Sequence, residues 1–325
     1  MSSPPSGAPS VRAAVVARVK RVRKVFVRPV QRAAREAARS TAARLGQVFL
    51  PPWRCPGCGG WKKARHLAPC AGVVDVSALR RSTSATGCPR CGLLYVTPFP
   101  PASDLRKLYS LGGGWATGHP QDTSDIAGTH LIEALDRIVG FRAPAPGSCV
   151  LDFGCGHGRW LNTFAEFGWT TFGIDPALKT AFTRHSELTA VGDSPRFQFV
   201  VASHVLEHVP NPGSILEQLG RATVPGGWIY VAVPHLDALP AHRDWKYVLS
   251  AGTHLAAYSL HCLTYLLAQS GFDAPVEIVV PKDRKGQFRL RIVARRGSPR
   301  PVAPEPLTSA LVALRKAGVG TATAR

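Results

Sequence analysis

Three segments of this chain place chemically active residues at spacings that could bind a ligand or do chemistry. The first, LDFGCGHGRW from Leu151 to Trp160, puts an aspartate directly before a glycine-rich turn. The apolar run before Asp152 is typical of a buried strand, and the apolar residues from Arg159 onward recur at helical spacing until Gly168. A strand-to-helix glycine turn lets backbone N–H groups approach a ligand without a side chain in the way. The segment therefore predicts a nucleotide- or nucleoside-binding turn.

The spacing of the glycines distinguishes between such ligands, because it is G-x-G-x-G where dinucleotide-binding turns have G-x-G-x-x-G. Asp152 would repel a pyrophosphate, but it suits a ligand that carries an ammonium or sulfonium group. Asp175 follows the next expected strand, Thr170–Ile174, and an acid there is placed to accept hydrogen bonds from ribose hydroxyls. A nucleoside with a cationic amino-acid tail and no phosphate is S-adenosylmethionine (SAM). The expected ligands of SAM are thus Asp152, Asp175 and the glycines Gly154, Gly156 and Gly158.

The second segment contains four of the 8 cysteines in two matched knuckles, Cys55-Pro-Gly-Cys58-Gly and Cys88-Pro-Arg-Cys91-Gly. Each C-x-x-C places two thiolates on one tight turn, and two such turns complete a tetrahedral zinc site. The gap between the knuckles allows a small ribbon with an inserted loop. A redox disulfide is the alternative, and two identical knuckles favour zinc. Cys70 is a possible substitute ligand, and three others are expected to be small buried apolar residues: Cys149, Cys155 and Cys262.

The third segment is rich in histidine and follows expected strands, where the catalytic groups of an open α/β sheet lie. His204, Glu207 and His208 come directly after the expected strand Phe197–Ser203, and their spacing predicts one shared helical face. His254 opens the later segment HLAAYS, ahead of an expected helix, Ser259–Ser270. A histidine could act as a general base. His208 is the first candidate, His254 the second and His204 the third. In the alternative interpretation, Glu207 and His208 only shape the turn.

Taken in this order, VLDFGCGHGRW, HVLEHV and HLAAYS resemble the class I SAM-dependent methyltransferases, in the branch with an LEHV and a late HLxxYS segment. The resemblance spans roughly residues 147–287 and implies a doubly wound, Rossmann-like α/β sheet. In this branch a four-cysteine module directly precedes the methyltransferase domain, which implies a small N-terminal zinc ribbon. It also implies that Asp193 lies near the adenine. Some similar quinone-type O-methyltransferases hold a divalent ion with the LEH segment, which here is Glu207 and His208.

The net charge of +20 is carried by the ends of the chain and not by its centre. Residues 1–50 contain eleven Lys and Arg against one acid, whereas residues 111–280 contain nine against fifteen. The basic N-terminal segment is interpreted as a solvated tail, an amphipathic helix on an anionic membrane surface, or a nucleic-acid arm. No apolar run reaches the length of a membrane span. We therefore expect a cytoplasmic protein whose tails could associate with a membrane surface.

These observations predict five regions and one main function. The function is SAM-dependent methyl transfer to a small-molecule, sugar or glycolipid-type acceptor. The alternatives are an RNA or protein methyltransferase that uses the basic flanks, and a non-catalytic SAM-binding zinc scaffold. The expected regions are a basic tail (1–50), a zinc ribbon (51–100), a connecting helical segment (101–143), the methyltransferase domain (144–298) and a basic C-terminal tail (299–325).

Overall fold

The computed structural model describes part of the chain, and all of the described residues belong to one compact unit, Pro52–Arg325. The basic N-terminal tail, the whole segment 98–128, Cys70, Asp193 and nearly all of the C-terminal tail lie outside the described residues. The expectations for them therefore remain predictions. The described residues are 54–60, 65–69, 84–97, 129–175, 185–191, 197–236, 254–278, 289–297 and 302–303.

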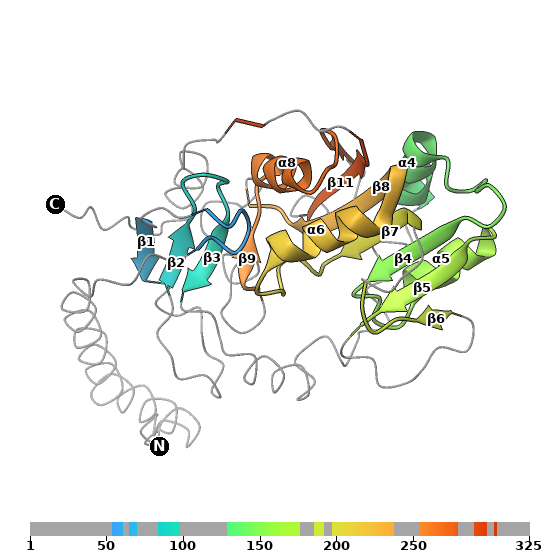
Figure 1. The fold of residues 1–325 in the computed structure, drawn as a ribbon, viewed down its shortest axis with the longest axis horizontal. Helices are drawn as coiled ribbons and strands as arrows, with labels where there is room; N and C mark the ends of the chain where they lie inside the picture. The colour runs from blue at the N-terminus through green and yellow to red at the C-terminus, as the bar shows by residue number, and fades with distance from the viewer. Residues whose placement is uncertain are drawn as a thin grey trace, which may run out of the picture. The chain divides into compact units, whose positions relative to one another are not determined.

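The larger of two sheets has seven strands in the order β10-β11-β8-β7-β4-β5-β6 (Figure 1). Strands β4, β5, β6, β7 and β8 run parallel, and β11 and β10 extend the sheet in antiparallel fashion beyond β8. The parallel strands therefore share one carboxyl edge, where ligands of open α/β sheets bind. Their bounds are β4 Cys149–Phe153, β5 Thr170–Ile174, β6 Ser186–Glu187, β7 Phe197–Ser203, β8 Thr223–Pro234, β10 Val276–Glu277 and β11 Arg289–Arg295.

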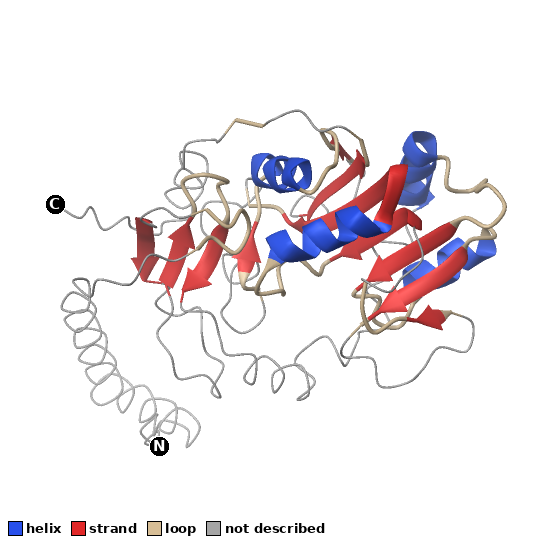
Figure 2. Ribbon diagram, viewed as in Figure 1, coloured by secondary structure: helices blue, strands red, loops and turns tan. Residues whose placement is uncertain are grey.

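Helices cover both faces of this sheet (Figure 2). On one face, alternate strand residues pack against α4 and α5. Phe164 of α5 is in ring contact with Trp160 of the same helix and with Phe199 of β7. The other face packs against α6 and α8 through leucines such as Leu216 and Leu263. The expected doubly wound α/β fold is confirmed, and β6 is its shortest parallel strand, with two residues. The helices are α4 Thr129–Val139, α5 Arg159–Glu166, α6 Pro212–Ala222 and α8 Leu260–Gln269.

The smaller sheet carries the cysteine knuckles and has the strand order β1-β2-β3-β9, with every pair antiparallel. Three strands come from the N-terminal part of the chain: β1 Arg65–Pro69, β2 Ser84–Gly87 and β3 Leu94–Thr97. The fourth, β9 Ala256–Ala257, comes from the HLAAYS segment far along the sequence. The ribbon expected around the cysteines is thus completed by a strand that the sequence did not indicate.

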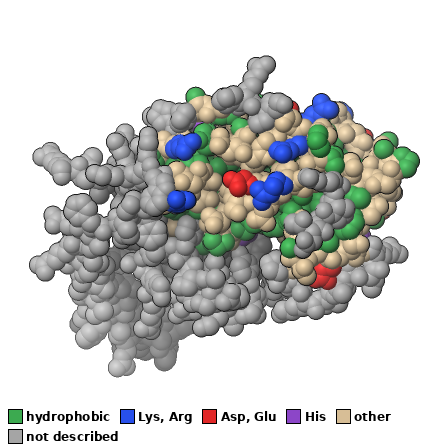
Figure 3. Space-filling view, viewed as in Figure 1, with side chains coloured by type: hydrophobic (Ala, Val, Ile, Leu, Met, Phe, Trp, Pro, Cys, Tyr) green, Lys and Arg blue, Asp and Glu red, His purple; other side chains and the backbone are tan. Residues whose placement is uncertain are grey.

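No described helix is long and apolar enough to cross a membrane. On the face in Figure 3, the Lys and Arg side chains of the described residues are scattered, and the central one lies beside an acidic side chain. The described part of this face therefore contains no continuous basic patch of the kind that binds a nucleic-acid backbone.

Candidate functional site

The glycine turn between β4 and α5 is fastened to the neighbouring strand. The N–H groups of Gly154 and Cys155 donate to the carbonyl oxygen of Ile174 in β5, at 2.7 and 3.2 Å. A side chain at Gly154 would collide with Val205 in the turn after β7. Glycine is required here because all three glycines have left-handed backbone angles, with φ of 78° at Gly154, 50° at Gly156 and 74° at Gly158.

Two carboxylates lie beside this turn. Asp152 is 2% exposed, and its Oδ1 has no hydrogen-bond partner among the described residues. Burial, together with the negative charge of Asp175, raises the pKa of the Asp152 carboxyl to about 8. Asp175 is half-buried, and its Oδ2 accepts a hydrogen bond of 2.8 Å from the N–H of Gly156. The turn therefore presents one buried acid, to which no other described residue supplies a counter-charge, and one acid held in a fixed orientation.

The turn after β7 contains His204, Glu207 and His208, and it is not a helix. The expectation of one helical face is wrong, because His204 has φ 55° and its N–H donates to the carbonyl oxygen of Ala232 at 2.8 Å. That bond continues the ladder to β8 instead of starting a helix. His204 has the only positive φ found outside glycine among the described residues. Such strain is retained where the surrounding structure fixes it, and it is frequent at functional sites.

Three histidines nevertheless gather around Glu207, which is fully buried. His204 Nδ1 lies 3.0 Å from Glu207 Oε1, and His208 Nε2 lies 3.9 Å from the same oxygen. The rings of His208 and His254 are in edge contact, with centroids 4.8 Å apart. Of the residues singled out in the sequence, the structure thus brings together His204, His208 and His254, and Glu207 is their centre.

The charge of Glu207 is maintained by its neighbours. Burial is the largest single influence and acts to raise its pKa, but the hydrogen bond with His204 and the charges of His208, His204 and His254 outweigh burial and lower the pKa. Its Oε2 is buried without a hydrogen-bond partner in the described part of the chain. Glu207, His208 and His254 each offer one ligand atom, and these atoms lie within 4.8 Å of one another. The cluster can therefore hold a proton or a cation.

Sequence reasoning named the segment HLAAYS but missed the long-range hydrogen bonds that place His254. Leu255 N and Ala256 N donate to the main-chain oxygen of Glu207, at 2.6 and 3.3 Å, and Tyr258 Oη donates to the Leu206 oxygen at 2.7 Å. No local spacing predicts these bonds, because they join residues about 50 positions apart. His235, the fourth histidine at this edge, forms an isolated backbone bridge with Tyr258.

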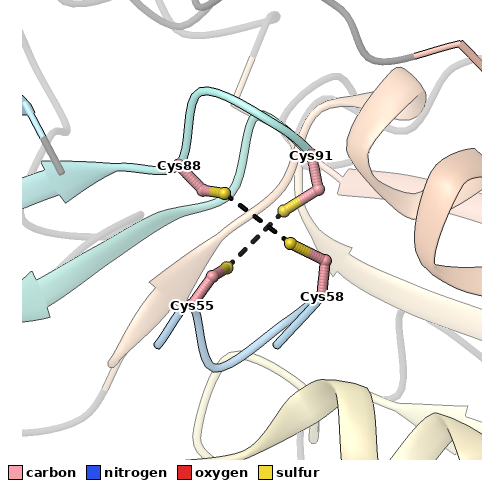
Figure 4. A group of neighbouring side chains, drawn as sticks. All are labelled: Cys55, Cys58, Cys88 and Cys91. Atoms are coloured by element: carbon pink, nitrogen blue, oxygen red, sulfur yellow. Dashed lines mark hydrogen bonds between the residues drawn. The ribbon is translucent and has the colours of Figure 1, made fainter. Parts of the chain in front are cut away.

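The four knuckle cysteines converge as the sequence predicts (Figure 4). Cys55 Sγ lies 3.7 Å from Cys91 Sγ, and Cys58 Sγ lies 3.7 Å from Cys88 Sγ. A disulfide needs about 2.05 Å, whereas sulfurs placed tetrahedrally around zinc at about 2.3 Å are about 3.8 Å apart. Hydrogen bonds from Cys55, Cys58 and Cys91 hold the pKa of the Cys88 thiol well below its usual range. The geometry is that of a metal site.

The glycine after each knuckle has the left-handed conformation that this turn needs, with φ 64° at Gly59 and 74° at Gly92. Each glycine N–H donates to the carbonyl oxygen of the first cysteine of its knuckle, at 2.9 Å for Gly59 and 3.0 Å for Gly92. Of the other described cysteines, Cys262 adjoins the four-sulfur cluster through a side-chain hydrogen bond with Cys91. Cys155 and Cys262 are buried as expected, whereas Cys149 is only half-buried at the start of β4.

Comparisons with known proteins agree on one family. A family model described as a methyltransferase domain matches residues 127–275. The ubiquinone biosynthesis O-methyltransferase of Thiobacillus denitrificans is 31% identical over 176 residues, which cover 47% of this chain and 74% of that protein. The protein of the same name from Caulobacter vibrioides is 34% identical over 152 residues, which cover 36% of this chain and 60% of that protein.

Solved structures that resemble this chain include a SAM-dependent methyltransferase from Mesorhizobium loti, with a TM-score of 0.40, 19% identity, and coverage of 50% of this chain and 98% of that one. A second is the 1,6-didemethyltoxoflavin-N1-methyltransferase of Burkholderia thailandensis. Its TM-score is 0.46, its identity is 19%, and the match covers 66% of this chain and 96% of that one.

Proposed function

This chain belongs to the class I SAM-dependent methyltransferases, and on that premise we propose that it methylates an oxygen atom of a small-molecule acceptor. Its relatives at 31% and 34% identity are named ubiquinone biosynthesis O-methyltransferases, which puts oxygen first among acceptor atoms. The sugar and glycolipid acceptors expected from the sequence also offer a hydroxyl. The observation that carries the proposal is the buried Glu207 with its histidines, which lies at the same sheet edge as the glycine turn.

We propose that SAM lies along the glycine turn, with its amino-acid part near Asp152 and its ribose on Asp175. The ammonium group of SAM would supply the counter-charge that the buried Asp152 lacks among the described residues. The bond from Gly156 orients the Asp175 carboxylate, so that it can accept from ribose hydroxyls. The glycines allow close approach of the ligand to the backbone. For Asp193, which lies outside the described residues, we propose a contact with the adenine.

A hydroxyl acceptor must lose its proton as its oxygen attacks the methyl carbon. SAM, when bound, supplies the methyl group on a sulfonium. His204 Nδ1 lies within hydrogen-bonding distance of Glu207 Oε1, so with Nδ1 as donor the Nε2 of a neutral His204 becomes the proton acceptor. The Glu207 carboxylate then stabilises the imidazolium. His208 and His254, ranked first and second from the sequence, are the alternative bases, because they are buried beside the same carboxylate.

Product analysis with labelled SAM tests this proposal. The purified protein is offered a soluble catechol, free and nucleotide-linked sugars, a glycolipid, RNA and a protein extract. We expect a methyl ether on one of the small molecules, formed in equal amount to S-adenosylhomocysteine. His204→Gln should abolish turnover, while His261→Gln on α8 serves as the matched control. Methylation of RNA or protein alone would support the rival function, and SAM binding without any transfer would support a scaffold.

We also propose that one structural zinc ion is held by Cys55, Cys58, Cys88 and Cys91. The support is the sulfur spacing, which matches a closed tetrahedral site with four thiolates and no open position. Such an ion would contribute to folding and take no part in the chemistry of methyl transfer.

A second candidate function for the Glu207 cluster is to hold a divalent cation. The buried Oε2 of Glu207 and the close approach of the ligand atoms of His208 and His254 favour it. The test is metal analysis before and after dialysis against a mild chelator that leaves the cysteine-bound zinc in place. Loss of a second ion together with turnover would support a cation. Unchanged turnover with one zinc per chain would support the histidine base alone.

A further inference from the structure

The strand that completes the cysteine-bearing sheet comes from the catalytic side of the molecule. β9 pairs with β3 through Leu94 opposite Ala257 and Tyr95 opposite Ala256. Val96 N also donates to the Leu255 oxygen at 3.0 Å. Since Leu255 directly follows His254, β3 fixes the main chain that carries this histidine.

The same segment holds Glu207. Two consecutive N–H groups, those of Leu255 and Ala256, donate to the Glu207 main-chain oxygen at 2.6 and 3.3 Å. The hydroxyl of Tyr258 donates to the neighbouring oxygen of Leu206 at 2.7 Å. Tyr258 is fully buried, and burial raises its pKa well above the usual range, so its hydroxyl stays a donor. Three hydrogen bonds thus link one short segment to the turn that positions Glu207.

Both cysteine knuckles contact the helices that flank this turn and segment. Gly213 N, at the start of α6, donates to the Pro56 oxygen at 3.2 Å, and a side chain at Gly213 would collide with the main chain of Gly57. Arg90 of the second knuckle donates through Nε to the hydroxyl of Tyr265 on α8 at 2.8 Å. The knuckles are therefore fixed to the elements on either side of the Glu207 cluster.

The glycine turn is held differently. Gly154 N and Cys155 N donate to Ile174, and Gly156 N donates to Asp175, so these bonds stay within one strand–helix–strand unit. They do not depend on the pairing between β3 and β9. A loss of order in the cysteine-bearing sheet would therefore reach Glu207 and His254 before it reached the residues proposed to bind SAM.

We propose that the cysteine module, meaning the two knuckles and strands β1, β2 and β3 with their metal bound, positions Glu207 and its histidines for catalysis. Tyr258 is the positioning residue between this module and the turn that carries Glu207. The inference rests on the proposed function and assigns the module a part in methyl transfer. Cys91 stands three residues before Leu94, so the metal anchors one end of β3. Proton transfer requires donor and acceptor at hydrogen-bonding distance, and small displacements of the base lower the rate steeply.

The test compares the metal-loaded protein, the metal-stripped protein and Tyr258→Phe. Thr264→Val is the control, because it removes a hydroxyl whose hydrogen bond, to the Leu260 oxygen at 2.8 Å, stays within α8. SAM affinity is measured by calorimetry, turnover with the acceptor found in the panel, and the imidazole signals of the 11 histidines by NMR. Signals of His204, His208 and His254 are assigned from their Gln variants.

We expect metal removal and Tyr258→Phe each to lower kcat at least tenfold and to shift the signals of the three clustered histidines. SAM affinity should stay within twofold, and Thr264→Val should behave like the parent. A parallel loss of SAM affinity and kcat, or unchanged histidine signals after metal removal, would overturn the inference. If no acceptor in the panel is methylated, the proposed function fails, and the histidine signals and SAM affinity still test the link from module to cluster.

Discussion

The carboxyl edge has two halves that we name from the proposed function: the cofactor half, proposed to bind SAM, and the acceptor half, proposed to face the acceptor. They are built over very different distances along the chain. The cofactor half, which comprises β4, the glycine turn and Asp175, is assembled from one strand–helix–strand unit. The acceptor half joins the turn at 204–208, the segment 254–258 and a sheet that begins near residue 65. A locally assembled unit can be recognised from a motif, and we expect it to keep its structure when other parts of the protein are perturbed. The acceptor half depends on long-range pairing, and we expect it to be the more easily disturbed.

The largest expected effect is the loss of stability on metal removal, and it should be confined to the acceptor half. Cys88→Ser combined with Cys91→Ser should remove one zinc per chain and destabilise the cysteine-bearing sheet, on the order of several kcal/mol. Hydrogen exchange should show faster exchange at Val96 in β3 and little change in β4 and β5. Cys149→Ser, outside the cluster, is the control. Equal acceleration in both sheets would contradict the division into halves.

Neutralising Glu207 should stop chemistry without weakening cofactor binding. Glu207→Gln keeps the shape of the side chain but removes the charge that stabilises a protonated histidine, so kcat should fall about 100-fold or more. SAM affinity by calorimetry should stay within about twofold. Glu217→Gln, the same change at an exposed position of α6, should leave both quantities unaltered. A matching fall in SAM affinity would show that the two halves are energetically coupled and would contradict their separation.

The cofactor half should respond to pH through Asp152. Burial raises its pKa to about 8 in the SAM-free protein, so the folded chain keeps a proton that the unfolded chain loses near pH 4. Stability of the SAM-free protein should therefore fall as pH rises from about 4 to about 8. SAM affinity should rise over the upper part of that range, by at most about tenfold per pH unit, and then flatten. Asp152→Asn should make the SAM titration flat; a pH slope that persists in this variant would exclude Asp152.

The smallest effects distinguish packing from backbone strain within the glycine turn. Gly156→Ala meets no atom within 4 Å, so it should cost only the left-handed penalty of about 1 to 2 kcal/mol. Gly154→Ala carries the same penalty and also collides with Val205, so it should cost more. Chemical denaturation of the SAM-free protein measures both. Adding Val205→Ala should recover part of the loss at Gly154 and none at Gly156, and equal recovery at both would refute the packing contact.

The sequence predicted individual strands and helices well where their signals are local. The apolar runs matched β5 and β7 at both ends, and the helix expected at Ser259–Ser270 was found as α8 with Ser259 as its N-cap. Hydrophobic periodicity and glycine spacing act over a few residues, which is the range over which a strand, a turn and a helix are decided. The cysteine pairs were predicted for the same reason, since each knuckle is a single turn.

The acceptor half was predicted only in its residue types. The i, i+3, i+4 spacing of His204, Glu207 and His208 suggested a helical face, but a bond from His204 to Ala232 forces a positive φ at the first residue. The role of β9 had no local signal, because its two alanines pair with residues more than 150 positions earlier. Burial of Glu207 at the centre of the histidines follows from that pairing and could not be deduced from composition or spacing.

The order of strands in the smaller sheet also has a consequence for synthesis of the chain. All four knuckle cysteines are translated by residue 91, so a nascent chain could bind the proposed zinc ion early, while β9 is not made until residue 257. Until then, the edge of β3 is open, with unpaired backbone groups that can recruit other strands. Ribosomal pausing or truncation between these points should therefore yield metal-containing fragments that aggregate, whereas fragments that extend beyond residue 257 can close the edge.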